Sequence, residues 1–426
     1  MSLNKYCFIV LAWGLFLAGG PAAADVPPAL AGLLGEVLKG HPEVRSAEAA
    51  LAAAEARARA AGRPLYNPEL ELDTEQTGVN TTFLGLNQSI DWTDKRGARS
   101  DRGAREAAAA RAELVLVRQR VAGEFLDALN RYHTGRAAAR LAQRRVALLE
   151  DFLDLARRRL AAGDVGQSDV DLARLALSEA RMAAAGRASD LAGAEAALRA
   201  MVSRAPTRWP VLPPLPPARI DAAMERLLDA HPRLLRDQAR FQAARAGVEL
   251  ARRERRPDPT VGLRGGRDDE DTLLGLTLTV PLFVRNNFRA EVEAAAAEAQ
   301  RNEAEYRNSR RRIRAAMEAA ADRYRLTRAA LTDWERSGRP SLQGRVKLLQ
   351  RLWESGEINT TEYLVQLQQT LDTELAAVEL QGSAWVAWLA WLAASGQVTP
   401  WLGLAGEPAL DNRMPSSAAG GTGETQ

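Results

Sequence analysis

The chain has 426 residues, a formal net charge of +3 and only 5% aromatic residues. Acids and bases are interleaved along it, so no one-sided basic patch indicates a nucleic-acid partner. Abundant Ala, Leu, Arg and Glu with few large side chains are typical of long helices packed side by side. No nucleophile triad and no glycine-rich phosphate loop is recognisable, so we expect neither an enzyme nor a cofactor-binding protein.

The N-terminus has the features of a secretory signal peptide. Lys5 precedes an apolar stretch over residues 6–18, and small residues at 22–24 offer a cleavage site. We therefore expect residues 1–24 to be removed on export. An uncleaved anchor is the alternative, but the apolar stretch is short for a span of ~20 residues. The single cysteine, Cys7, lies in this segment, so no disulfide or thiolate metal site is expected in the exported chain.

The rest of the sequence carries the same landmarks twice. His41-Pro42 recurs as His231-Pro232 and Leu84-Gly85-Leu86 as Leu274-Gly275-Leu276, both 190 positions later, and Ala162-Gly163 is echoed 193 positions later by Ser355-Gly356. Such repetition predicts two copies of one structural unit. We assign a first repeat to residues 25–204, a Pro-rich linker to 205–218, a second repeat to 219–398 and a disordered tail to 399–426.

Each repeat is expected to contain a helix, two strands, a long helix, a glycine turn and a return helix. The predicted helices are 29–62, 98–160 and 168–202 in the first repeat and 221–256, 289–354 and 359–394 in the second. The helix over 98–160 is on the order of 90 Å long. Ser168 with Asp171, and Asn359 with Glu362, are the expected N-terminal caps. Trp385–Ala394 is too short to span a membrane and is expected to be a packed helix face.

Period-2 alternation predicts two pairs of strands. In the first pair, leucines alternate with the acids Glu69, Glu71, Asp73 and Glu75. This pattern is typical of transmembrane barrel strands, with apolar residues toward lipid and polar residues toward the lumen. An open sheet leaves backbone groups unpaired in lipid, so four strands need further copies of the chain. Three copies give a barrel of 12 strands with room for a lumen, whereas two give eight and little space.

This ordered set of features resembles the TolC family of outer-membrane efflux channels over roughly residues 29–395. Three segments are similar to its CzcC-type heavy-metal branch: Asn67-Pro68-Glu69-Leu70, Lys95-Arg96-Gly97-Ala98-Arg99, and Pro281-Leu282-Phe283 with Arg285-Asn286. The sequence departs from that branch at residues 91–94, where a glycine pair is expected. The resemblance implies a mainly α protomer with four strands, and a trimer that forms a 12-stranded barrel and an α-helical tunnel.

The resemblance also implies a function and partners. The trimer would be the passive exit duct of a tripartite efflux system in the outer membrane of a Gram-negative bacterium, with its helical part in the periplasm. It would dock to a periplasmic membrane-fusion adaptor and to an inner-membrane resistance-nodulation-division pump, and would export heavy-metal cations. The turns with Gly163, Gly166 and Gly356 would form the adaptor-docking tip. Asp169 and Glu362 would be periplasmic gate acids.

Each of these sites has a simpler interpretation. Asp169 and Glu362 can serve as first-turn acids that the helix dipole favours. The family's second gate acid corresponds to Val365 here, which predicts a thinner gate ring. The four strand acids, twelve in a trimer, would favour cations in the upper pore, but they can also be ordinary solvated residues. His41, His133 and His231 are far apart in the sequence; they are expected to mark helix starts rather than to bind metal.

Two alternatives to the metal-efflux function stay open. A drug-efflux channel or a type I secretion channel would keep the fold and change the cargo. A soluble periplasmic coiled-coil or adaptor protein is an alternative from another class, but it leaves the alternating strand pairs unexplained.

Overall fold

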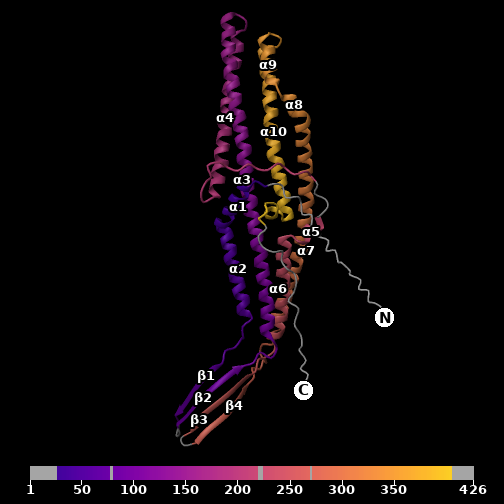
Figure 1. Ribbon diagram of the computed structural model, residues 1–426. Coiled ribbons are helices and arrows are strands. Elements are labelled where there is room, and N and C mark those ends of the chain that lie inside the picture. Colours follow the sequence, from indigo (N-terminus) through magenta and orange to yellow (C-terminus); the bar gives the residue numbers. More distant parts are fainter. Residues whose placement is uncertain (1–25, 77–79, 219–223, 269–270, 405–426) are drawn as a thin grey trace, which may run out of the picture.

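The structure is a computed structural model that describes residues 26–76, 80–218, 224–268 and 271–404. The described chain is elongated, with a small sheet at one end and two helical hairpins at the other (Figure 1). The predicted signal peptide lies outside the described residues.

The first repeat contains four helices and two strands. They are α1 (Pro28–Gly40), α2 (Pro42–Ala61), β1 (Glu69–Gln76), β2 (Asn80–Ser89), α3 (Lys95–Ala162) and α4 (Gln167–Ala200). The second repeat follows the same order with additional breaks. Its elements are α5 (Met224–Asp229), α6 (Pro232–Glu254), β3 (Thr260–Asp268), β4 (Asp271–Thr279), α7 (Arg289–Asp333), η2 (Trp334–Gly338), α8 (Arg339–Leu342), α9 (Arg345–Glu354), α10 (Thr360–Ser395) and α11 (Val398–Trp401).

The helix predicted to open each repeat is divided at its histidine. His41 and His231 have extended backbones, and each precedes the proline that begins the next helix. A residue before proline is disfavoured in the helical region, which accounts for the break. The two imidazoles accept hydrogen bonds at Nδ1 from the backbone N–H groups of Glu43 (3.4 Å) and Arg233 (3.1 Å). Both histidines therefore mark helix starts, as predicted.

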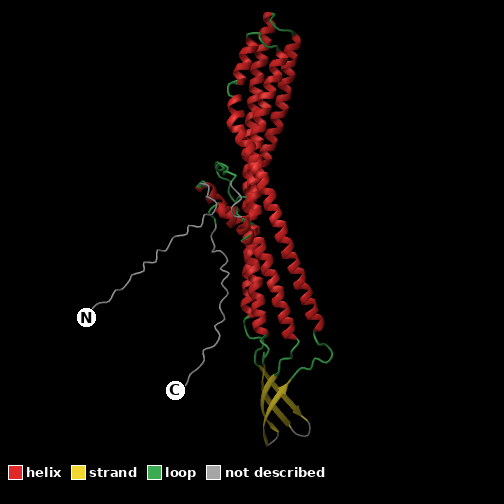
Figure 2. Cartoon of the chain, turned by 90° about the vertical axis from the view of Figure 1, so that its right-hand side faces the viewer, coloured by secondary structure: helices red, strands yellow, loops and turns green. Residues whose placement is uncertain are grey.

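The four strands form one antiparallel sheet in the order β1-β2-β3-β4. The two repeats meet at its centre, where Leu86 of β2 pairs with Leu263 of β3. Each strand continues into a helix, and the helices pack in the matching order α2, α3, α6 and α7. The sheet and the helical layer therefore form one continuous wall (Figures 1 and 2).

The two long helices differ. α3 runs unbroken for 68 residues, a length of about 100 Å. The helix predicted over 289–354 is interrupted by the π-helix η2 and by a break at Gln343 and Gly344, where Gly344 has φ +77°. The second repeat has three more residues between its strand pair and its glycine turn than the first. A π-helical segment closes i→i+5 hydrogen bonds, so it holds more residues per turn than an α-helix and can take up residues added to the helix.

The main hydrophobic core lies midway along the elongated molecule. There Phe125 of α3, Tyr324 of α7 and Trp388 of α10 are buried, and the Tyr324 and Trp388 ring centroids are 4.9 Å apart. α10 is long and apolar enough to cross a membrane, but its tryptophan-rich end is packed in this core, as predicted. Residues 398–401 form α11, and Trp401 is buried against Trp388. The start of the predicted tail is therefore ordered, and residues 405–426 lie outside the described residues.

Candidate functional site

The sheet has one apolar face and one polar face. Directly paired residues of neighbouring strands share a face, so the register groups nine aliphatic side chains on one side: Leu70, Leu72, Leu84, Leu86, Val261, Leu263, Leu274, Leu276 and Leu278. Their exposed fractions in the single chain lie between 42% and 82%. A continuous apolar surface of this kind marks a membrane or partner contact.

The predicted acids lie on the opposite, polar face. Glu69, Glu71, Asp73 and Glu75 alternate with Leu70, Leu72 and Thr74 along β1, and the Glu71 carboxylate accepts a hydrogen bond from the Asn87 side chain at 2.8 Å. The register adds Phe83 and Arg264 to this face. Neither was singled out from the sequence, although Arg264 alternates with Val261 and Leu263 as a lumen residue would.

The sheet is open at both edges. Within the described residues β1 pairs only with β2, and β4 pairs only with β3. Open edges leave backbone N–H and C=O groups unpaired, which a hydrocarbon environment does not tolerate. The sheet in a membrane therefore requires strands from further copies.

A buried ion pair joins the two repeats where the sheet meets the helices. The Lys95 ammonium, at the start of α3, lies 2.9 Å from the Asp258 carboxylate, just before β3, and both side chains are nearly inaccessible. The Tyr66 hydroxyl donates to the same carboxylate oxygen at 2.6 Å. This hydrogen bond, together with burial, raises the pKa of Tyr66 to about 12. The Lys95 segment stands out in the sequence, but its pairing with Asp258, 163 residues away, was not predicted.

The segment at residues 91–94 caps α3. The Asp91 carboxylate accepts from the backbone N–H groups of Lys95 and Arg96, both at 2.8 Å. Asp94 is in the left-handed region (φ 57°) and accepts from the Gly97 N–H at 3.0 Å. The segment that departs from the CzcC-type pattern thus supplies two carboxylates, Asp91 and Asp94, which accept hydrogen bonds from the free N–H groups at the start of α3.

The hairpin tips are glycine turns. Gly163 (φ +82°) and Gly356 (φ +76°) are left-handed, and a Cβ at either position would meet no atom within 4 Å. Gly166 has φ −85° and serves as the N-cap of α4, which begins at Gln167. The Gly166 N–H donates to the Asp169 carboxylate at 2.9 Å. The predicted cap by Ser168 and Asp171 is therefore wrong by two positions, because α4 starts before Ser168.

The two candidate gate acids have different local roles. The Asp169 carboxylate accepts a hydrogen bond from the Gly166 N–H at the start of α4. The α10 cap is supplied by Asn359, whose Oδ1 accepts from the Glu362 N–H at 2.8 Å, as predicted. The Glu362 carboxylate itself is exposed and accepts from the Gln366 side chain at 3.2 Å.

An aromatic cluster near the tips links the two hairpins. The Phe152 ring of α3 is 4.7 Å from Trp353 and 4.5 Å from Tyr363, centroid to centroid. The Arg159 guanidinium lies 4.7 Å from the Trp353 ring and donates to the Trp353 carbonyl at 2.8 Å. This cluster was not predicted, since its members are scattered over both repeats.

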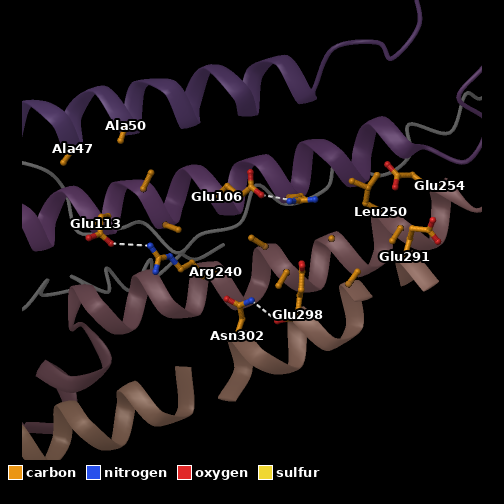
Figure 3. Close-up of a pocket in the computed structure, with 18 residues that line it drawn as sticks. Ala47, Ala50, Glu106, Glu113, Arg240, Leu250, Glu254, Glu291, Glu298 and Asn302 are labelled. Atoms are coloured by element: carbon orange, nitrogen blue, oxygen red, sulfur yellow. Dashed lines mark hydrogen bonds and ion pairs between the residues drawn. The ribbon is translucent and has the colours of Figure 1, made fainter. Parts of the chain in front are cut away.

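A hollow of about 630 Å³ lies in the helical wall between α2, α3, α6 and α7 (Figure 3). Alanines from all four helices line it, together with the acids Glu106, Glu113, Glu254, Glu291 and Glu298. Glu106 pairs with Arg102 at 2.9 Å and Glu113 with Arg236 at 3.0 Å.

The prediction that the histidines mark helix starts is wrong for His133, which lies inside α3. The His133 ring is hydrogen-bonded to the Pro210 carbonyl at 2.7 Å. His231 is buried, and desolvation lowers its pKa to about 4. Within the part of the chain that the structure describes, no group of three or more His, Cys, Asp or Glu residues is arranged to hold a metal ion.

A duplicated protomer with a two-faced, open-edged sheet and a continuous helical wall defines the class of outer-membrane channel proteins. The sequence matches the outer membrane efflux protein family over residues 33–204 and 223–397, and the chain belongs to that family. The family and its structural neighbours are channels rather than enzymes. The predicted TolC-like fold is confirmed, and a trimeric barrel is consistent with these neighbours. Family membership disfavours the soluble adaptor alternative.

Individual relatives point in the same direction. The cobalt-zinc-cadmium resistance protein CzcC of Cupriavidus metallidurans is 25% identical over 326 residues, which cover 72% of this chain and 76% of CzcC. The structure of CusC has a TM-score of 0.73 at 16% identity, covering 86% of this chain and 92% of CusC. VceC from Vibrio cholerae has a TM-score of 0.72 at 20% identity, covering 86% and 96%. The predicted resemblance to the CzcC-type branch is therefore confirmed.

Proposed function

We propose that this outer-membrane efflux channel is the exit duct for heavy-metal cations in a tripartite system with a periplasmic adaptor and an inner-membrane pump of the resistance-nodulation-division class. The similarity to a cobalt-zinc-cadmium resistance protein supports the cargo. The acids on the polar face of β1 support it independently, because rings of carboxylates favour cations in a pore. Metal ions are the cargo here and are not held as a cofactor.

The observation that carries the proposal is the two-faced sheet with two open edges. Three copies placed side by side would pair β4 of one chain with β1 of the next and close a barrel of 12 strands. The apolar face would then contact lipid, and Glu69, Glu71, Asp73 and Glu75 would face the lumen. Because each helix continues a strand, the helical layer, with its acid-lined hollow, would extend the conduit into the periplasm.

The proposal also divides the chain into segments. We assign residues 1–24 to a cleaved signal peptide, 25–204 and 219–398 to the two repeats, 205–218 to the linker between them and 399–426 to a tail, in which Trp401 and Leu402 are buried. The helical hairpins would lie in the periplasm. Their tips, with Gly163, Gly166 and Gly356, would receive the adaptor.

Asp169 and Glu362 would stand near the constriction at these tips. The exposed Glu362 carboxylate is the better gate candidate, because Asp169 is engaged in the cap of its own helix. Replacing Glu362 with Ala is expected to raise the conductance of the channel in lipid bilayers.

The experiment that tests the cargo is a susceptibility panel on a deletion strain and its complemented control. Salts of zinc, cobalt, cadmium, nickel and copper are set against dyes, detergents and antibiotics. Sensitivity to metals alone, restored by complementation, is the expected result. Sensitivity to organic compounds alone would make the chain a drug-efflux channel and overturn the metal assignment.

Complementation with tip variants adds a test of the docking site. Gly356→Leu is expected to leave trimer assembly intact and to impair export, because the left-handed turn requires glycine. Gly123→Ala, within the helical wall, serves as the control and is expected to complement fully. Normal export by Gly356→Leu with adaptor binding retained would contradict the tip assignment.

A further inference from the structure

The polar face of the sheet contains one base among its acids. Of the described strand residues that the register places on this face, Arg264 is the only basic one. Arg267, further along β3, pairs with Thr82 and Thr272 and therefore lies on the apolar face. The polar face thus carries positive charge only at the level of Arg264.

Arg264 lies flat against the wall instead of extending from it. Its guanidinium carbon is 5.2 Å from the centre of the Phe83 ring on β2. On its other side is Gly275 of β4, where an added Cβ would lie 3.1 Å from Arg264 Nε and 3.3 Å from Cγ. Cation–π contact holds a guanidinium over an aromatic ring, and the glycine leaves the space in which the arginine lies.

The register also places Arg264 in the same row as an acid, two strands away. Glu71, Gly85, Arg264 and Gly275 are paired across the four strands in a single row. Neighbouring strands are ~4.8 Å apart, so the charged positions alternate about every 10 Å along the wall. In a closed barrel this row would have a carboxylate and a guanidinium from each copy, whereas the neighbouring row through Asp73, Phe83, Gly266 and Leu273 contains an acid and no base.

We propose that Arg264 is a selectivity-determining residue of the upper pore, which offsets the strand acids at one level and limits the preference of the pore for cations. The inference rests on the proposed channel function, since it requires the polar face to line the lumen. Positive charge fixed beside the pathway lets anions accompany the cations through this level. A ring of acids alone would retain cations and exclude their counter-ions.

The test is the reversal potential of purified channels in planar bilayers under a KCl gradient. Arg264→Gln is expected to raise the permeability ratio of K⁺ over Cl⁻ by roughly two- to four-fold, the effect of one unit charge at several ångströms in water. Arg264→Glu is expected to raise it further. Arg267→Gln, which removes the same charge from the opposite face of the same strand, is the matched control and should leave the ratio unchanged.

A second pair of variants tests the position of the side chain. Gly275→Ala is expected to displace Arg264 toward the lumen and reduce single-channel conductance. Gly265→Ala lies on the apolar face, where its Cβ would be 3.8 Å from Leu274, and should leave conductance unchanged. An unchanged ratio for Arg264→Gln, or an equal shift for Arg267→Gln, would overturn the proposal. Absence of any channel activity in the unmodified protein would instead refute the proposed function.

Discussion

The two repeats have the same structure at the strand pair and at the glycine turn, and they differ between these two points. Each repeat has its strand pair at one end of the wall and a left-handed glycine turn at the other end. Between these points α3 is continuous, whereas the second repeat is divided into α7, η2, α8 and α9. The ends are constrained by strand pairing and by the tip turn, while the middle of a helix in a layered wall can absorb added residues. The comparison indicates that strand pairing and the tip turns, rather than the helices between them, fix the order of elements that the two repeats share.

The largest expected difference concerns the buried ion pair. The position 190 residues after Lys95 is Arg285, which is exposed, so the second repeat has no equivalent pair there. Asp258→Ala leaves the Lys95 ammonium buried and unpaired, which costs ~3–5 kcal/mol. Arg285→Ala is expected to change stability by less than about 0.5 kcal/mol.

Thermal unfolding of the detergent-solubilised protein measures both variants. The double substitution Lys95→Met with Asp258→Leu separates the lost charge pair from lost packing, because replacing both partners with apolar groups is expected to be close to neutral. A destabilisation of the Arg285 variant equal to that of Asp258→Ala would remove this distinction between the repeats.

The second prediction concerns pH. Burial lowers the pKa of His231 from 6.5 to about 4, so the folded protein holds this side chain neutral. Between pH 6.5 and 4 the unfolded chain binds the proton more readily, and stability falls as the pH falls, by up to ~3 kcal/mol. His231→Asn keeps a side chain that can cap α6 and removes the titration. It should flatten the pH dependence of the unfolding midpoint over this range. An unchanged profile would contradict the assignment, and His41→Asn is the matched control.

The third prediction concerns glycine-to-alanine substitutions in the two long helical segments, which are expected to change stability in opposite directions. Gly344 is left-handed, so Gly344→Ala is expected to cost ~1–2 kcal/mol. Gly123 is inside α3, so Gly123→Ala is expected to stabilise by ~0.5–1 kcal/mol. Neither added Cβ would meet an atom within 4 Å, so backbone conformation alone accounts for both effects. Chemical denaturation of the two variants in parallel checks the signs; the same sign for both would show that the break at Gly344 is not retained.

The smallest expected effect distinguishes the two candidate gate acids. Asp169→Ala removes the cap at Gly166 and is expected to cost ~1 kcal/mol. Glu362→Ala leaves the Asn359 cap in place and should change stability by less than about 0.5 kcal/mol. Unfolding midpoints of the two variants provide the measurement. Equal losses would mean that the acids have the same structural role in both repeats.

The sequence alone was sufficient for the plan of the molecule. The repeated landmarks, the period-2 strands and the glycine turns each follow from local rules of backbone conformation and from the alternation of apolar and polar residues. For this reason the alternation along residues 69–75 is enough to assign the strand acids to one face of the sheet. The predicted cap at Asn359 and the packed tryptophan face also depend on neighbouring residues in the chain.

Only the tertiary structure decided how distant segments combine. The pairing of β2 with β3, the Lys95–Asp258 pair and the aromatic cluster of Phe152, Trp353 and Tyr363 join residues far apart in the chain. The position of Arg264 over Gly275 likewise depends on a register set between neighbouring strands. Local patterns specify which face a residue occupies, but the partner across the sheet or the bundle is fixed by packing between elements, and no local pattern contains that information.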